Sequence, residues 1–229
     1  MKFTFYGHAA LQIEAAGKTF LMDPFFTGNS LVEGKISPDT LNPDIILLTH
    51  AHGDHYGDTP SILKRTGALL ISNYDICMYV LANEGHENFH PMNTGGAFAF
   101  DWGRIKQTYA RHSSVFPDGT AGGNPNGYIL QVEGKTIYLA GDTDVFAEMA
   151  YIGEDYAIDV AFLPIGDNFT MGHQDSVRAA KMLKPKLICP THYDTFPYIK
   201  TDLQAWEALM AEAGFKTQCI EIGDHFILD

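Results

Sequence analysis

The segment Thr49–His55, with the sequence Thr-His-Ala-His-Gly-Asp-His, limits most strongly what this chain can fold into. It ends the near-continuous apolar run Asp44–Thr49, which is typical of a strand buried on both faces. Three imidazoles and one carboxylate follow within six positions: His50, His52, Asp54 and His55. Side chains two positions apart cannot share one face of a helix, unlike the i, i+4 pairs of helical zinc sites. The spacing therefore predicts a loop at the end of a buried strand.

Ligand-type side chains gathered this closely need a physical reason. Divalent metal ions recruit neutral imidazole and carboxylate together, and this chemistry favours a metal site. The alternative is a polar loop in which Asp54 caps a helix that begins near Tyr56. Four such groups in one short segment favour the metal interpretation.

Three further candidate ligands also follow predicted strands, where sheet folds build their sites. They are His112 after Arg104–Ala110, Asp142 after Lys135–Ala140, and His192 after Lys186–Pro190. Together with the four groups of the first motif they make seven ligands, enough for two metal ions that share one carboxylate. Asp142 competes with Asp144, because Asp-Thr-Asp before a helix also resembles an N-terminal cap. We favour Asp142 as the ligand and Asp144 or Thr143 as the cap.

The hydrophobic pattern predicts short strands in the first part of the chain and strands alternating with helices later. The other predicted strands are Lys2–Tyr6, Ala10–Glu14, Lys18–Asp23, Ala68–Ser72, Phe98–Phe100, Gly127–Glu133, Asp159–Leu163, Thr217–Ile222 and His225–Leu228. The predicted helices are Thr59–Arg65, Tyr74–Asn83, Val145–Ile152, Gln174–Leu183 and Leu203–Ala213. No linker of Pro, Gly or Ser composition divides the chain. We therefore expect a single α/β domain over residues 1–229, with sheets inside and helices outside.

Composition restricts the partners. The chain has 28 acidic against 15 basic residues and a formal net charge of -13, so no nucleic-acid partner is expected. No apolar stretch approaches ~20 residues, so no membrane span is expected, and the segment Met1–Gly7 resembles a first strand rather than a signal peptide. Three widely spaced cysteines argue against a disulfide framework and favour the cytoplasm. The expected partner is a small-molecule substrate, and a homo-oligomer is compatible with the sequence.

The motif order resembles that of the metallo-β-lactamase superfamily: Thr-His-Ala-His-Gly-Asp-His, then a distant His, then Gly-Asp-Thr, then Thr-His. Gly7-His8-Ala9 and Met22-Asp23-Pro24-Phe25 look like the opening of its branch of small metal-dependent hydrolases, which are related to ascorbate-phosphate lactonase. The resemblance implies a four-layer αββα sandwich of two mixed sheets with outer helices.

The resemblance also implies a dinuclear metal site and a reaction. His50, His52 and His112 would hold one ion, Asp54, His55 and His192 the other, and Asp142 would bridge them. Zinc is the first choice and manganese the second, and iron is also compatible with nitrogen and oxygen ligands. A metal-bridging hydroxide, positioned by Asp54, would attack a small ester, lactone or phosphate ester, with a lactonase-like activity favoured. The alternatives are a phosphodiesterase acting on a small nucleotide or phospholipid-derived ester, and a metal-binding sensor without turnover.

Departures from the superfamily pattern argue against three of its classes: the commonest β-lactamases, the oxygen-reducing flavo-diiron proteins and the nucleases. Asp142 stands where the commonest true β-lactamases carry Cys, and Gly53 stands where the flavo-diiron relatives have an acidic ligand. The extra domain or basic arm usual in the nucleases is not visible. His173 and Asp194 also differ from the usual residues of the branch, and both could alter the pocket.

Four further residues are candidates for supporting the metals or the substrate, and each has an ordinary alternative. Asp23 could orient a ligand imidazole, or simply end a strand in a turn. His8 could line the site or be a hydrogen-bonded structural histidine. His173 could hydrogen-bond the substrate or merely begin a helix. Arg111 could hold an anionic group or be a solvated charge.

Overall fold

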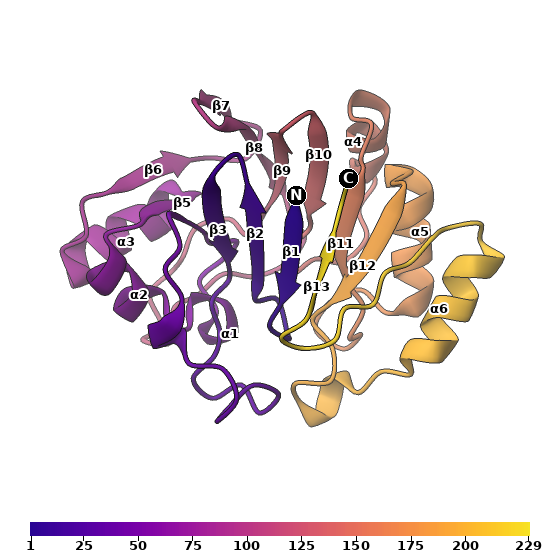
Figure 1. The fold of residues 1–229 in the computed structure, drawn as a ribbon, viewed down its shortest axis with the longest axis horizontal. Coiled ribbons are helices and arrows are strands. Elements are labelled where there is room, and N and C mark those ends of the chain that lie inside the picture. Colours follow the sequence, from indigo (N-terminus) through magenta and orange to yellow (C-terminus); the bar gives the residue numbers. More distant parts are fainter.

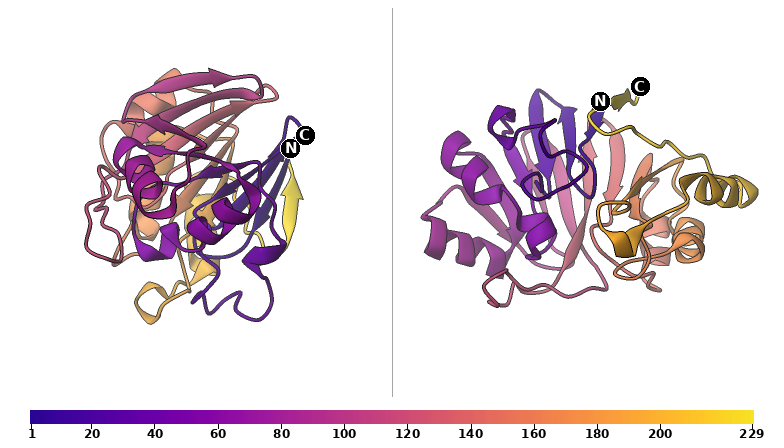
Figure 2. Two further views of the ribbon diagram at one scale, coloured as in Figure 1. Left: turned by 90° about the vertical axis from the view of Figure 1, so that its left-hand side faces the viewer. Right: turned by 90° about the horizontal axis from the view of Figure 1, so that it is seen from below.

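The computed structural model describes residues 1–229 and contains two mixed β-sheets packed face to face, with helices on their outer faces (Figure 1, Figure 2). This is the four-layer αββα arrangement that the sequence predicts. The two ends of the chain lie side by side, because the first and last strands pair and the Met1 amino group donates to the Leu228 carbonyl at 3.1 Å (Figure 1).

The first sheet has seven strands in the order β13-β1-β2-β3-β4-β5-β6. Its strands are β1 (Lys2–Phe5), β2 (Leu11–Ala15), β3 (Lys18–Met22), β4 (Ile45–Leu47), β5 (Leu69–Asn73), β6 (Phe89–Met92) and β13 (His225–Ile227). Pairing is antiparallel from β13 to β3 and parallel from β3 to β6.

The second sheet has six strands in the order β12-β11-β10-β9-β8-β7. They are β7 (Ala97–Phe100), β8 (Gly103–Tyr109), β9 (Asn126–Val132), β10 (Lys135–Leu139), β11 (Val160–Pro164) and β12 (Leu187–Thr191). Pairing is antiparallel from β7 to β10 and parallel from β10 to β12. The carboxyl ends of β8, β10, β11 and β12 therefore lie at one edge of this sheet.

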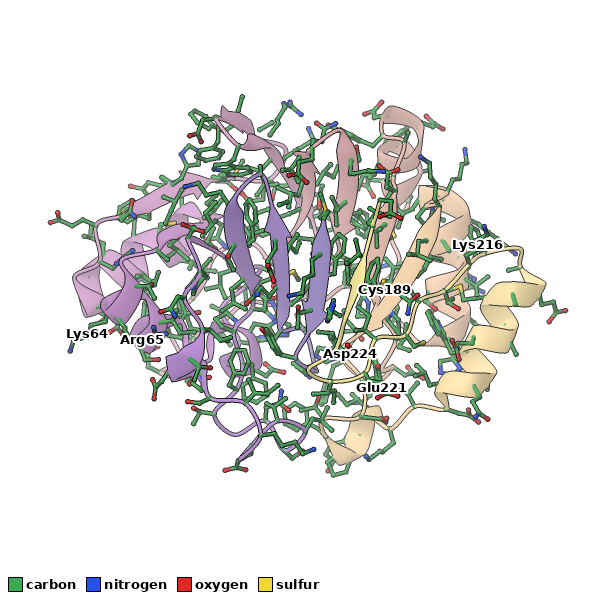
Figure 3. The ribbon with its side chains drawn as sticks, in the orientation of Figure 1. Lys64, Arg65, Cys189, Lys216, Glu221 and Asp224 are labelled. Atoms are coloured by element: carbon green, nitrogen blue, oxygen red, sulfur yellow. The ribbon has the colours of Figure 1, made fainter.

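Helices cover the outer face of each sheet. The α-helices are α1 (Gly53–Tyr56), α2 (Thr59–Thr66), α3 (Tyr74–Glu84), α4 (Met149–Asp155), α5 (His173–Leu183) and α6 (Leu203–Glu212), and short 3₁₀ helices are η1 (Pro38–Thr40) and η2 (Pro197–Ile199). Helices α2 and α3 pack on the first sheet, and α4, α5 and α6 pack on the second. Lys64 and Arg65 on α2 and Lys216 after α6 lie on opposite flanks of the molecule (Figure 3). No helix combines the length and apolar character needed to cross a membrane.

Alternating side chains build separate apolar cores on the two faces of each sheet. In β4, Ile45 and Leu47 face the other sheet, whereas Ile46 packs against the helices. In β12, Cys189 faces the core between the sheets and Ile188 faces the helices. Burial on both faces explains why the sequence of β4 is apolar throughout.

The predicted strand Thr217–Ile222 is wrong. Only Thr217 forms an isolated bridge, to Ile188 of β12, and the chain then crosses to the first sheet, where β13 pairs with β1. Glu221 and Asp224 lie on this crossing (Figure 3). A segment that connects two sheets cannot keep pairing with the strands of either one. It therefore forms no strand, although its composition is typical of one.

One further strand and the start of one helix also differ from the sequence prediction. Strand β6 is absent from the sequence prediction, because Pro91 interrupts its strand pattern. The proline fits here because β6 is the edge strand of the first sheet, and edge strands can accommodate a residue without a backbone N–H. The helix predicted at Val145–Ile152 begins only at Met149, with Glu148 as its N-terminal cap. Asp144 instead forms a bridge with Arg111, which keeps the backbone there extended.

Candidate metal centre

Five strands end at the same edge of the sandwich and deliver polar side chains there. They are β3, β4, β8, β10 and β12, which are followed by Asp23, His50, His112, Asp142 and His192 respectively. Segments far apart in the sequence thus meet because the strands run in the same direction. The seven ligands predicted from the sequence all lie in this region and fall into overlapping groups.

The Thr49–His55 segment is not only a loop, which corrects the sequence-based expectation. His52 has extended backbone, and α1 then begins with the Tyr56 N–H donating to the His52 carbonyl at 2.8 Å. His50 and His52 therefore project from extended chain, whereas Asp54 and His55 project from a helical turn. This change of conformation places His52 and Asp54 in different groups, whereas His50 and His55 remain neighbours, with ring centres 4.1 Å apart, and form a third group with Asp142.

The first group contains His50, His52 and His112, each of which offers a ring nitrogen within 4.8 Å of the others. The ring centres of His50 and His112 lie 5.1 Å apart, and those of His52 and His112 lie 5.0 Å apart. His50 is fully buried, while His52 and His112 face the pocket. This is the ligand set that the resemblance implies for the first ion.

The second group contains Asp54, His55 and His192 together with His8. His8 lies beside His192 with ring centres 4.1 Å apart, and its Nε2 is 3.1 Å from Asp54 Oδ2. The backbone of both histidines has positive φ, 56° at His8 and 55° at His192. Non-glycine residues in this conformation cost free energy and cluster at functional sites.

Asp142 lies between the two groups. Its Oδ2 is 3.0 Å from His192 Nε2, 3.3 Å from His55 Nε2 and 3.5 Å from His112 Nε2. Because His112 belongs to the first group and His55 and His192 to the second, one carboxylate reaches both. Asp144, the competing candidate, is half-buried, accepts from the Val145 N–H at 2.7 Å and belongs to neither ligand group.

The donor set fits divalent cations. His55 Nε2, His192 Nε2 and Asp142 Oδ1 are buried but make no hydrogen bond. A buried polar atom without a partner costs roughly 1–3 kcal/mol, and such atoms are rare in native proteins. Here both ring nitrogens lie beside the Asp142 carboxylate, 3.3 and 3.0 Å from its Oδ2, and a cation held by the two imidazoles and this carboxylate would provide the missing partners. Nitrogen and oxygen donors without a thiolate suit Zn²⁺, Mn²⁺ or Fe²⁺.

Burial keeps several of the imidazoles neutral. It lowers the pKa of His50 well below the ordinary value, and it also lowers the pKa of His52 and His112. It lowers the pKa of His8 to about 4, with the neighbouring His192 acting in the same direction. Neutral imidazole is the form that binds metal, so these groups need no deprotonation at neutral pH.

The carboxylates, in contrast, are held in the charged form. Burial would raise the pKa of Asp142, but the charges of His192 and His55 outweigh burial and hold that pKa well below its usual range. The same opposition applies to His192, where burial would lower the pKa but Asp142 raises it to about 9. A cation bound at His192 would take the place of the imidazole proton, because only the neutral ring binds metal.

Asp23 supports His55 from behind. Its carboxylate is buried, accepts from His55 Nδ1 at 2.8 Å, and accepts from the Thr49 N–H and hydroxyl at 2.8 and 2.7 Å. This bond fixes the His55 proton on Nδ1 and leaves Nε2 to face Asp142. Asp23 also forms the turn after β3, because the Phe25 N–H donates to its carbonyl at 2.8 Å.

The remaining candidates lie in different places. His8 is fully buried, and its Nδ1 is 2.9 Å from Thr195 Oγ1. His173 begins α5 and lines a separate cavity of about 610 Å³ beside α6 that contains none of the seven ligands. Arg111, whose side chain is mostly exposed, pairs with Asp144 at 3.2 Å and does not line the metal pocket. Neither Asp144 nor Thr143 caps a helix, because α4 begins beyond them.

A smaller cavity of about 480 Å³ opens onto the two ligand groups. Its polar part is formed by five candidate ligands and one serine: His52, Asp54, His112, Ser113, Asp142 and His192. Its apolar walls come from two loops and were not predicted as site residues: Phe169 after β11, and Phe196, Pro197 and Tyr198 after β12. Their signal in the sequence was aromatic residues placed in polar loops directly after strands.

A two-sheet sandwich whose strand ends bring histidines and aspartates together defines the metallo-β-lactamase class of fold. A family model described as a β-lactamase superfamily domain matches residues 2–192. The chain is 44% identical to a UPF0173 metal-dependent hydrolase of Salinibacter ruber over 98% of each chain. It is 47% identical to another from Shouchella clausii, over 93% of this chain and 98% of the relative.

A solved structure agrees with these relatives. Igni18, a metallo hydrolase from the hyperthermophilic archaeon Ignicoccus hospitalis, is 36% identical, with a TM-score of 0.88 over 100% of this chain and 99% of that chain. The chain therefore belongs to the UPF0173 family of metal-dependent hydrolases within the β-lactamase superfamily. The superfamily and the fold predicted from the sequence are confirmed.

Proposed function

We propose that this chain is a dinuclear metal-dependent hydrolase of small esters or lactones. In this proposal His50, His52 and His112 hold one ion and Asp54, His55 and His192 hold the other. Asp142 binds both, and its position within 3.5 Å of histidines from both groups is the observation that supports two ions rather than one. Zinc is the preferred metal, followed by manganese, with iron also compatible.

Bound divalent cations would supply a water of lowered pKa and polarise the oxygen that gains charge during attack. The chain's own residues then determine orientation. The Asp54 carboxylate lines the pocket and is held by His8, so its free oxygen can accept a hydrogen bond from the attacking water and aim it. Asp23 keeps His55 in the tautomer that leaves Nε2 free.

The three cysteines support a cytoplasmic location for this activity. Cys77, Cys189 and Cys219 are all free, which fits a reducing compartment such as the cytoplasm. A small-molecule substrate fits the size of the cavity, about 480 Å³.

Metal content tests the ligand assignment. We expect two ions per chain in the wild type and fewer in His52→Ala and Asp142→Ala, measured by elemental analysis after dialysis. His225→Ala is the control, because this exposed histidine lies outside the ligand groups. Unchanged stoichiometry in both ligand variants would contradict the proposal.

A substrate panel tests the reaction. We expect turnover of lactones and esters and little turnover of bis-(p-nitrophenyl) phosphate. The opposite preference would indicate a phosphodiesterase. A protein that binds metal but hydrolyses no ester, lactone or phosphodiester would instead be a metal-binding sensor.

A further inference from the structure

Two exposed aromatic side chains stand at the mouth of the metal pocket. Phe169 is 51% exposed and Tyr198 is 75% exposed, and both line the cavity that contains His52 and His112. Their ring centres lie 6.4 Å apart with an angle of 78° between the planes. Large apolar side chains exposed together at a cavity mark a surface that binds a ligand.

Both aromatic residues are held by loops tied to the metal centre. The Phe169 loop is tied to the Asp142 segment, because the buried Met171 donates its N–H to the Thr143 carbonyl at 3.1 Å. The Tyr198 loop is tied to the His192 segment in the same way, by the Asp194 N–H donating to the Ile199 carbonyl at 2.8 Å. The two rings are therefore positioned relative to the ligands that precede them in the chain.

The walls of the cavity contain no basic side chain apart from the candidate histidine ligands. No Lys or Arg lines it, and the nearby cations are engaged elsewhere. Arg111 pairs with Asp144, and Lys200 lines the other cavity and donates to the Asp194 carbonyl at 3.3 Å. A substrate with a second anionic group, beyond the reacting atoms, would find no partner for that charge outside the metal ions.

We infer that the substrate is an ester or lactone whose non-reacting part is uncharged and aromatic or bulky apolar, and that Phe169 and Tyr198 contact this part. The inference rests on the proposed function and specifies its substrate class. Hydrolysis adds one water across the acyl C–O bond, so an ester gives a carboxylate, an alcohol and a proton, while a lactone gives a hydroxycarboxylate and a proton. The carboxylate forms at the metal end of the pocket, and the apolar group stays between the rings.

The test compares kcat/KM for p-nitrophenyl phenylacetate, p-nitrophenyl acetate and the p-nitrophenyl monoester of succinate. In the wild type we expect the order phenylacetate, acetate, succinate. Phe169→Ala and Tyr198→Ala should each lower the preference for phenylacetate over acetate by about threefold to tenfold, the contribution of one aromatic contact. Tyr151→Ala is the matched control, because Tyr151 is an equally exposed aromatic on α4, away from the cavity, and it should keep the preference.

A binding measurement separates this inference from the proposed function. Phenylacetate should bind the metal-loaded protein more tightly than acetate by calorimetry, and the two alanine variants should lose this difference even if no ester is turned over. Tyr198→Phe should retain it, because the ring remains. A wild type that prefers the succinate ester, or alanine variants that keep the full phenyl preference in both assays, would overturn the inference.

Discussion

Replacing Asp23 by Asn tests whether this buried carboxylate sets the tautomer of His55. Asn is close in size to Asp and tolerates the positive φ of 42° found at this position. The substitution removes the charge and converts one accepting oxygen into a donating NH₂ group. If the amide oxygen still accepts from the Thr49 N–H, the NH₂ group of the new asparagine faces His55 Nδ1. Because this NH₂ group can only donate, His55 Nδ1 must then accept the hydrogen bond.

The expected magnitude follows from that change. With Nδ1 accepting, the His55 proton moves to Nε2, the atom that points at Asp142, and a protonated nitrogen cannot bind a cation. A hydrogen bond to a charged group contributes about 1.5–3 kcal/mol. Since 1.4 kcal/mol is a factor of ten, metal affinity should fall roughly 10- to 100-fold, in agreement with typical effects of residues that support a metal ligand.

The assay is competition for Zn²⁺ with a fluorescent chelator, with thermal unfolding recorded in parallel. Asp58→Asn is the matched control, because Asp58 also accepts three hydrogen bonds, from the Phe26 N–H at 2.8 Å and from the Thr27 N–H and hydroxyl at 2.9 and 2.6 Å. It touches no ligand, so it should lower stability and leave zinc affinity unchanged. Wild-type affinity in Asp23→Asn, or an equal loss in Asp58→Asn, would show that Asp23 does not set the tautomer of His55.

Two further predictions concern packing and thiol chemistry. A Cβ at Gly166 would overlap the carbonyl oxygen of His192, so Gly166→Ala should cost about 1–3 kcal/mol and also weaken metal binding, measured by melting and by zinc competition. Unchanged affinity would show that the His192 backbone yields without moving the ring. Burial raises the pKa of Cys77 to about 12, so at pH 8 its thiolate fraction falls by roughly a thousandfold. Cys77 should therefore react with a thiol reagent far more slowly in the native than in the unfolded protein, and fast native labelling would contradict this.

Much of the fold was predictable because its signals are local. The apolar run Asp44–Thr49 indicates a doubly buried strand, and Ile45 and Ile46 do face opposite cores. Asn73, whose side chain accepts from the Ile76 N–H at 2.9 Å, caps α3 within one residue of the predicted start. The secondary-structure predictions are wrong where contacts with distant segments determine the conformation. The strand-like segment Thr217–Ile222 crosses between sheets, and Asp144 is held extended by a bridge rather than capping a helix.

The candidate site, like the fold, has some features that local sequence predicts and others that depend on distant contacts. Which residues are potential ligands, and that they follow strands, could be read from residue type and spacing alone. Their grouping could not be predicted, because it depends on the turn into α1 and on how the ends of β8, β10 and β12 meet this turn. Likewise, Phe169 and Tyr198 became recognisable as pocket walls only from their shared exposure at one cavity.

Residue types and their spacing are enough to predict the chemistry available to this protein, a set of imidazoles and carboxylates placed after strands. Neighbouring residues suffice for that, because ligand type and strand periodicity are short-range properties. Only the tertiary structure decided that Asp142 reaches both histidine groups and that Asp23 lies behind His55. Ångström distances between side chains depend on how two sheets pack, and packing is a property of the whole chain.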